Sequence, residues 1–156
     1  ATKVVLAQKT TTPLGIMGIT KGLIREFEGL KLERYKGLGH NEYAIGYGDT
    51  ICSKQYKQFS KQEAEKCLSS RVIDVFIKVR RDLPHLSSNE YAAVMSLVYN
   101  VGYGAFKRST LYTALKSNEY TTKQIQDKWL SFNKVNGKIS TGLVRRRQIE
   151  VNTFFA

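Results

Sequence analysis

The hydrophobic residues near the N-terminus recur at helical spacing. Between residues 17 and 28 apolar side chains lie on one face, which predicts an amphipathic helix over about 17–28. Residues 1–15 lack this period, and Thr10-Thr11-Thr12-Pro13 is expected to form a loop. Gly29 stands where a helix C-terminus favours a left-handed residue, so Glu28 is a carboxylate in the last helical turn. Negative charge there opposes the helix macrodipole. We interpret Glu28 as either an acid–base group or a solvated side chain that merely ends the helix.

The pattern changes between residues 30 and 50, where glycines alternate with aromatic side chains. This alternation predicts a small twisted β hairpin rather than a helix. It is the only β-like segment of any length that the pattern indicates. The residues concerned are Tyr35, Gly37, Gly39, Tyr43, Gly46, Tyr47 and Gly48.

From residue 60 to the end of the chain the pattern is helical. The capping box from Ser60 to Glu63 predicts a long helix over about 60–82, and a second box from Ser87 to Glu90 opens the next helix. Later helices are expected to start near Ser109, Thr121 and Thr141, with a turn at Asn136-Gly137. The predicted fold class is α+β, with a small N-terminal β lobe followed by a helical lobe.

The net charge of the chain says more about its possible partners than its length does. The chain has 156 residues, with 25 Lys and Arg against 13 Asp and Glu, and its net charge is +12. Such a charge attracts polyanions, which include nucleic acid, anionic lipid surfaces and the acidic polymers of a cell envelope. No apolar run approaches the roughly 20 residues needed to span a bilayer. The chain begins at Ala1 without a signal peptide of the usual form, and we expect that a segment has been removed upstream.

The cysteines and histidines give no framework for a disulfide scaffold or a metal site. One bridge between Cys52 and Cys67 is possible, but we expect two free thiols, with Cys67 buried on a helix face and Cys52 in a loop. His40 and His85 lie far apart and form no metal-ligand pattern with the cysteines. We therefore expect neither a metal nor a cofactor.

Three segments agree in order and spacing with a known family. They are Phe27-Glu28-Gly29-Leu30 with Tyr35 and Ile45-Gly46-Tyr47-Gly48, then residues 97–106 with Ser109-Thr110-Leu111, and then Asn136-Gly137-Lys138 with residues 142–147 and Glu150. On these segments, over about residues 20–156, the chain resembles the phage-type lysozymes, which are peptidoglycan muramidases made by bacteriophages. The resemblance implies a lysozyme-like two-lobed fold in which a long helix joins the β lobe to the helical lobe.

Within that fold the chain is expected to form a single domain. Residues 1–15 would be an N-terminal extension, about 16–59 the first helix and the β lobe, about 60–82 the connecting helix, and about 83–156 the helical lobe.

The resemblance implies that Glu28 protonates the glycosidic oxygen between N-acetylmuramic acid and N-acetylglucosamine. Glycoside cleavage usually needs a second carboxylate, about 5 Å away as a nucleophile or roughly 6.5–9.5 Å away to activate water. Here Gly37 stands where the family typically has an Asp or a Cys, and Ala44 stands where it often has a Thr. Glu42 and His40 lie in the same loop, and each is a candidate for the second group or a solvated loop residue.

The other residues of the matching segments have less specific roles. Tyr35 and Tyr43 could line a sugar groove or be packed in the lobe. Asn100 is expected to close a helix and shape the floor of the cleft, or to contact the sugar directly. One of the three arginines over 145–147 is expected to pair with Glu28, and the others to lie on the surface.

Two further side chains have structural interpretations. Asp49 replaces a His found in many relatives, and we expect it to pair with a nearby basic group. Trp129 is expected to lie in the core.

The leading hypothesis is an endolysin that cleaves peptidoglycan, made in the bacterial host and acting in the periplasm or cell wall. It would act as a monomer, without nucleic acid as a partner. The alternatives are a degenerate lysozyme that binds peptidoglycan without cutting it, and a transglycosylase that uses a single acid. A basic nucleic-acid binder is the third alternative, but the chain lacks the RRM, helix-turn-helix and zinc signatures.

Overall fold

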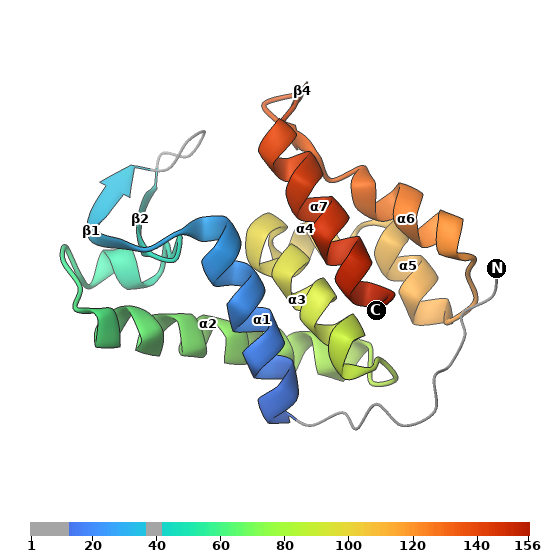
Figure 1. The fold of residues 1–156 in the computed structure, drawn as a ribbon, viewed down its shortest axis with the longest axis horizontal. Helices are drawn as coiled ribbons and strands as arrows, with labels where there is room; N and C mark the ends of the chain where they lie inside the picture. Colours follow the sequence, from blue (N-terminus) through green and yellow to red (C-terminus); the bar gives the residue numbers. More distant parts are fainter. Residues whose placement is uncertain (1–12, 37–41) are drawn as a thin grey trace.

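A computed structural model describes residues 13–36 and 42–156, and its helices surround a central helix beside a small β lobe (Figure 1). The helices are α1 (Pro13–Glu28), α2 (Lys61–Asp82), α3 (Ser88–Val101), α4 (Tyr103–Lys107), α5 (Thr110–Ser117), α6 (Thr122–Leu130) and α7 (Thr141–Phe154). The strands are β1 (Lys31–Lys36), β2 (Tyr43–Gly46), β3 (Lys134–Val135) and β4 (Lys138–Ile139), and a 3-10 turn, η1, covers Cys52–Lys54. This architecture confirms the predicted α+β class.

Helix α1 begins earlier than the hydrophobic period indicated. The expected loop is wrong at Pro13, where the helix starts, because the fixed φ of proline suits a first helical position. The other residues of that expected loop, 10–12, lie outside the described residues. Its apolar face buries Ile16 and Ile24 against the main core. The helix ends at Glu28, and Gly29 follows with φ +63°, as the sequence predicted.

The glycine- and aromatic-rich segment forms the predicted hairpin. Strands β1 and β2 pair in antiparallel fashion, with Tyr35 opposite Ala44 and Lys36 opposite Tyr43. A second, smaller core lies beneath the hairpin and is separate from the main one. Its buried members are Ile45, Cys52, Phe59, Ala64 and Cys67.

The expectation of two free thiols is wrong, because Cys52 and Cys67 form a disulfide. Their sulfur atoms are 2.08 Å apart, and the bond joins η1 to α2. The Asp49 carboxylate accepts hydrogen bonds at 2.8 Å from the backbone N–H groups of Ile51 and Cys52. These hydrogen bonds shape the turn after β2, and the disulfide attaches that turn to α2. No local sequence pattern reveals this long-range placement.

Helices α2 and α3 begin where their capping boxes predicted. Ser60 and Glu63 satisfy each other's backbone N–H groups, and Ser87 and Glu90 do the same. Helix α3 is the central element: it packs against α1, α2 and α7, and most of its side chains are buried. Trp129 lies fully buried in the main core, which confirms its predicted role.

The structure holds a second hairpin that the sequence pattern did not indicate. Strands β3 and β4 pair across Asn136-Gly137, where both residues have positive φ. That conformation matches the tight turns that join antiparallel strands, so the predicted turn is confirmed. The strands were missed because two residues are too few to show alternation.

Candidate active site

The end of α1 fixes the position of Glu28. The Gly29 N–H donates to the Arg25 carbonyl at 3.3 Å, and the chain then leaves the helix toward β1. The Glu28 side chain is 21% exposed, so its carboxylate is held by the protein and is still reachable. A negative charge in this last turn would destabilise the helix unless a cation offsets it.

Arg146 of α7 provides that cation. Its Nη1 lies 2.6 Å from Glu28 Oε1, and its side chain is only 6% exposed. The guanidinium carbon also lies 4.8 Å from the centroid of the Phe27 ring. The prediction that one arginine of the 145–147 triplet pairs with Glu28 is confirmed.

The opposite side of the Glu28 carboxylate faces Gly48. A Cβ atom at Gly48 would lie 2.8 Å from Glu28 Oε2, a distance that real Cβ contacts do not show. Gly48 also has φ +74°, which disfavours other residues. The turn after β2 therefore needs glycine here for two reasons, and it forms a backbone wall beside the acid.

A hydrogen bond from α3 holds this wall in place. The Tyr99 hydroxyl donates to the Tyr47 carbonyl at 2.5 Å, one residue before Gly48. Burial raises the pKa of Tyr99, and the negative charges of Asp49 and Glu28 raise it further. Tyr99 therefore stays protonated and keeps its role as donor.

A buried carboxylate, Glu150, stands behind Arg146. Glu150 is fully buried, and it accepts hydrogen bonds from Ser96 Oγ at 2.6 Å and from Trp129 Nε1 at 3.2 Å. Its Oε1 lies 2.7 Å from Arg147 Nε, and its Oε2 lies 3.4 Å from Arg146 Nε. Two carboxylates and two guanidiniums thus form a continuous network from Glu28 into the core.

Arg147 corrects one expectation from the sequence. The arginines that do not pair with Glu28 were expected on the surface, and Arg145 is exposed. Arg147, however, is fully buried, because Glu150 neutralises it and Phe132 accepts from its Nη1 at 3.4 Å. Burial lowers the pKa of Arg147, and the Glu150 carboxylate opposes that shift. The spacing of Arg146, Arg147 and Glu150 on one helix could have indicated this cluster.

The two candidate tyrosines lie on opposite faces of the hairpin, because directly paired strand residues share a face. Tyr35 is half-buried, and its pKa is raised by burial and by the Glu28 charge. Tyr43 is exposed and faces the Arg34 guanidinium, 4.3 Å from its ring centroid.

The candidates for a second catalytic group are less defined. Glu42 is exposed immediately before β2, and Ala44 is buried within that strand. His40 and Gly37 lie outside the residues that the structure describes.

Asn100 is exposed in the last turn of α3, and the predicted helix end is confirmed, since α3 stops at Val101.

Asp49 has the structural partner that the sequence predicted. Besides the two backbone N–H groups that it accepts from, its Oδ2 lies 3.5 Å from Arg71 Nε on α2. Asp49, Cys52 and Cys67 also bring one carboxylate and two sulfur atoms within 4.8 Å. Because the two sulfurs are joined in a disulfide, this group cannot act as a set of thiolate ligands.

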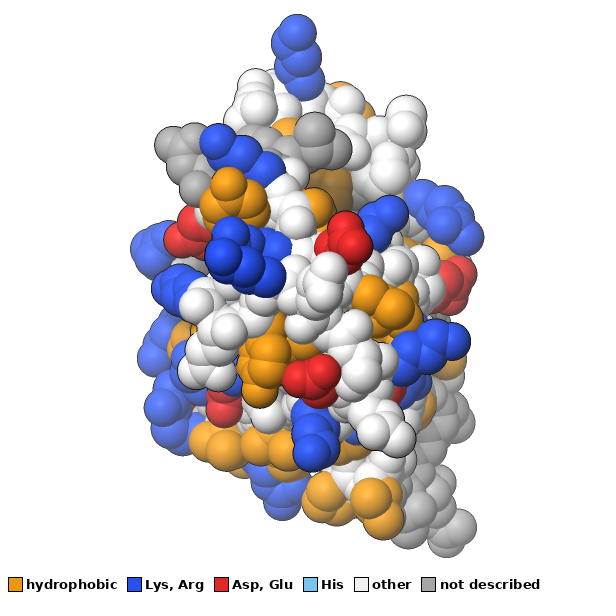
Figure 2. Space-filling view, turned by 90° about the vertical axis from the view of Figure 1, so that its left-hand side faces the viewer, with side chains coloured by type: hydrophobic (Ala, Val, Ile, Leu, Met, Phe, Trp, Pro, Cys, Tyr) orange, Lys and Arg blue, Asp and Glu red, His pale blue; other side chains and the backbone are white. Residues whose placement is uncertain are grey.

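Basic side chains are more common than acidic ones on the molecular surface around the β lobe (Figure 2). Lys and Arg side chains are spread over this face, with fewer Asp and Glu among them (Figure 2). No helix among the described residues is long and apolar enough to cross a bilayer.

Comparisons with known proteins identify the class to which this fold and site belong. A sequence model of the phage lysozyme family matches residues 25–150, and the chain belongs to this family. It is 33% identical over 142 residues to an endolysin of Acyrthosiphon pisum secondary endosymbiont phage 1, covering 85% of this chain and 92% of that protein. It is 34% identical over 140 residues to an endolysin of Bacillus phage B103, covering 85% of this chain. The chain spans about half the length of that second relative, 51%.

Solved structures show the same fold. An endolysin from Escherichia coli O157:H7 phage FAHEc1 superposes with a TM-score of 0.71 at 26% identity, covering 87% of this chain and 90% of that one. The muramidase domain of SpmX from Asticaccaulis excentricus superposes with a TM-score of 0.76 at 21% identity, covering 96% and 99%. The lysozyme-like fold that the resemblance implied is therefore confirmed.

Proposed function

We propose that this chain cleaves the glycan of bacterial peptidoglycan, between N-acetylmuramic acid and N-acetylglucosamine, and that Glu28 is its general acid. The observation that carries this proposal is the seating of the Glu28 carboxylate between the Arg146 guanidinium and the Gly48 backbone. A protonated Glu28 would donate its proton to the glycosidic oxygen as the bond to the anomeric carbon breaks. Arg146 then stabilises the carboxylate that remains.

The second group of a hydrolytic reaction is assigned to the loop before β2. Glu42 and His40 are the candidates to activate water there, since the family's usual positions hold Gly37 and Ala44. Tyr35 is proposed as a glycan contact because it is half-buried on β1 and the Glu28 charge contributes to its raised pKa. Tyr43 and Asn100 are exposed, and they stay predictions as glycan contacts.

A single-acid transglycosylase is the second candidate, and the residues at 37 and 44 favour it. Without a carboxylate to activate water, the C6 hydroxyl of the muramic acid could attack its own anomeric carbon. Glu28 would donate its proton to the leaving oxygen, and the Glu28 carboxylate so formed would accept the proton that the C6 hydroxyl loses as it bonds to the anomeric carbon. The product would be a 1,6-anhydro sugar.

Two matched relatives are named endolysins, which supports an action of this chain on the host cell wall. We propose that the chain is made in the bacterial host and acts as a monomer in the periplasm or the cell wall. Its net charge of +12 would draw it to the acidic envelope.

Incubation with purified peptidoglycan tests the proposal. We expect loss of turbidity together with new saccharide ends, and mass spectrometry separates the two reactions because only hydrolysis adds a water to the product. Retention on cell walls with no cleavage at any pH from about 4 to 8 would contradict the proposed activity and favour a binding protein. Size-exclusion chromatography tests whether the protein is a monomer in solution.

A further inference from the structure

Basic side chains from three helices meet at the C-terminal end of α2. Helix α2 ends at Asp82, α4 at Lys107 and α5 at Ser117, and each helix has a basic residue in its last turn. A cation in that position offsets the negative end of the helix dipole. We call this group the Asp82 cluster. Its members are Lys78, Arg81, Asp82, Tyr103, Lys107 and Lys116.

Asp82 is shared among three of these cations. Arg81 Nε and Nη2 each lie 3.1 Å from one of its carboxylate oxygens, and Lys107 Nζ lies 3.4 Å from Oδ2. Lys116 Nζ donates to the Asp82 backbone carbonyl at 2.8 Å. Hydrogen bonding by Arg81 lowers the pKa of Asp82, which keeps the carboxylate ionised at neutral pH. A single acidic residue therefore serves cations that come from α2, α4 and α5.

The Tyr103 ring brings the cations of α2 and α4 together. Lys78 Nζ lies 5.7 Å from the ring centroid, Lys107 Nζ lies 5.8 Å away and the Arg81 guanidinium carbon 6.0 Å away. Arg81 Nη2 also donates to the Tyr103 hydroxyl at 3.4 Å. Because Tyr103 is half-buried, it fixes one side of the cluster to the body of the protein.

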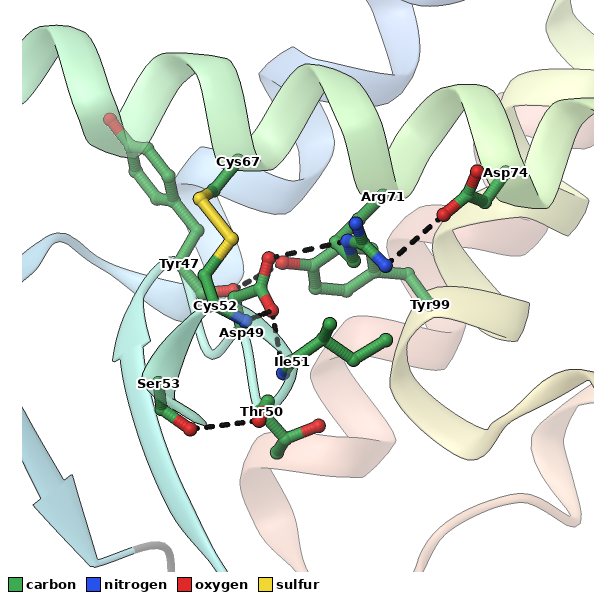
Figure 3. Close-up of a disulfide and its surroundings, with 10 residues drawn as sticks. All are labelled: Tyr47, Asp49, Thr50, Ile51, Cys52, Ser53, Cys67, Arg71, Asp74 and Tyr99. Carbon is green, nitrogen blue, oxygen red and sulfur yellow. Dashed lines mark hydrogen bonds and ion pairs between the residues drawn. A yellow bond between two sulfur atoms is a disulfide. The ribbon is translucent and has the colours of Figure 1, made fainter. Parts of the chain in front are cut away.

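Positive charge is in excess at the Asp82 cluster. Its four cations face one carboxylate, and no other acidic residue of the described ranges pairs with any of the four. Asp74 precedes Lys78 by one helical turn, but it pairs with Arg71 at 3.1 Å (Figure 3). The helix dipoles explain a basic residue at each helix end, but they do not require these residues to converge, and converging like charges repel. The convergence therefore indicates a place for a further anion.

The hydrogen-bond donors that Asp82 leaves unused face solvent. The Arg81 side chain is 60% exposed and that of Lys107 is 48% exposed, and Lys78 and Lys116 are also exposed. An ammonium has three N–H donors and a guanidinium has five, so one carboxylate cannot occupy them all. Since the donors lie on an open surface contributed by three helices, they suit a chain of repeated anionic groups better than one enclosed ion.

We propose that the Asp82 cluster binds the phosphodiester groups of an anionic cell-wall polymer. Phosphate oxygens accept hydrogen bonds from ammonium and guanidinium groups together, which is the combination that this surface offers. The choice of a wall polymer over other polyanions rests on the proposed function, in which the chain acts at the cell wall. A bound polymer would hold the protein on the wall between successive cleavage events.

Fluorescence anisotropy with labelled, soluble poly(glycerol phosphate) tests this proposal. The test variant is Lys78→Gln with Lys107→Gln, and the matched control is Lys61→Gln with Lys66→Gln near the start of α2. All four lysines are exposed, and each pair of changes removes two positive charges. A third variant, Lys78→Arg with Lys107→Arg, keeps the charge and the donors of the cluster. Equal Tm values establish that every variant is folded.

We expect the test variant to raise Kd roughly tenfold, whereas the control and the Lys→Arg variant should stay within about twofold of the wild type. The control should differ because its charges are screened from the cluster. At about 0.1 M ionic strength the Debye length is about 10 Å, and Lys66 lies roughly 18 Å from Lys78 along the helix at 1.5 Å per residue.

Equal loss of affinity in the test and control variants would show that net charge rather than the Asp82 cluster binds the polymer, and would overturn the proposal. Absence of binding by the wild type would also overturn it. Duplex DNA that binds more tightly than the polymer, with the same dependence on Lys78 and Lys107, would replace the wall polymer by a nucleic acid.

The binding assay contains no glycan, so its result is separate from that of the cleavage assay. Cluster-dependent binding by a wild type that releases no product from peptidoglycan would support the Asp82 cluster and contradict the proposed activity. Cleavage without polymer binding would support the activity and overturn the cluster.

Discussion

At the scale of single residues, the candidate acid depends on two neighbours of opposite character. Arg146 holds one side of the Glu28 carboxylate by charge, and Gly48 leaves room for the other side by having no side chain. The first contact comes from α7 and the second from the turn after β2, so the residue is fixed from both lobes. Small changes at either neighbour should therefore affect activity as well as stability.

Replacement of Gly48 by Ala tests the space beside the acid. The new Cβ would meet Glu28 Oε2 at 2.8 Å in a backbone of positive φ. We expect the free energy of unfolding to fall by about 1–3 kcal/mol and cleavage to fall by roughly 10²-fold. Gly22→Ala in α1 is the control, because nothing lies within 4 Å of the added atom, and it should be neutral or stabilising. Equal behaviour of the two variants would refute this role for Gly48.

Replacement of Glu150 by Gln tests the network behind Arg146. Gln keeps the shape but leaves the buried Arg147 without a counter-charge and leaves Arg146 with Glu28 as its counter-charge. We expect denaturant unfolding to show a loss of about 3–5 kcal/mol. Arg145→Ala removes an exposed pair with Glu26 and should change stability by less than about 1 kcal/mol. A Glu150→Gln protein as stable as the wild type would show that the network contributes little.

At the scale of elements, the turn after β2 is attached to α2 by two parallel links. The Cys52–Cys67 disulfide and the Asp49–Arg71 ion pair join the same turn to the same helix face, since Cys67 and Arg71 lie one helical turn apart. These links hold the turn that contains Gly48 against α2. The β lobe, whose own core is small, should depend on them.

The double variant Cys52→Ser, Cys67→Ser tests the covalent link. The disulfide spans a sequence separation of 15, and a loop of that size is expected to contribute about 3 kcal/mol to the free energy of unfolding. Thermal unfolding should therefore occur at lower temperature in the variant. A reductant should lower the Tm of the wild type toward that of the variant and leave the variant unchanged. A wild-type Tm that does not respond to full reduction would contradict this expectation.

The elements that local sequence determines were predicted well, and those that depend on distant partners were not. Ser60 with Glu63 marks a helix start because both capping bonds form within four residues. The disulfide was missed because it requires η1 to fold back onto α2. For the same reason, the Arg145–Arg147 run indicated a partner for Glu28 but not which arginine, nor that Arg147 is buried beside Glu150.

At the scale of the whole molecule, the net charge of +12 acts on association more than on folding. Basic side chains are spread over the face around the β lobe, where an acidic cell wall would be attracted (Figure 2). The Debye length falls from about 8 Å at physiological ionic strength to about 3 Å at 1 M, so this attraction is strongly screened by salt.

Salt dependence is the corresponding prediction. Cleavage of whole cell walls should fall about tenfold between low salt and 0.5 M, whereas cleavage of a short glycan fragment stripped of anionic polymers should change little. Initial rates at a series of salt concentrations measure both. Equal salt dependence for the two substrates would mean that the charge has no role in encounter with the wall.

The most direct test of Glu28 as the proton donor is the cleavage rate of a Glu28→Gln variant on purified peptidoglycan. Glu26→Gln is the matched control, because Glu26 is an exposed carboxylate on the same helix, two residues earlier. Loss of a general acid should lower the rate by roughly 10²–10⁴-fold with the fold intact, and the control should retain near wild-type activity. A Glu28→Gln protein that cleaves the glycan as fast as the Glu26→Gln control would contradict the assignment.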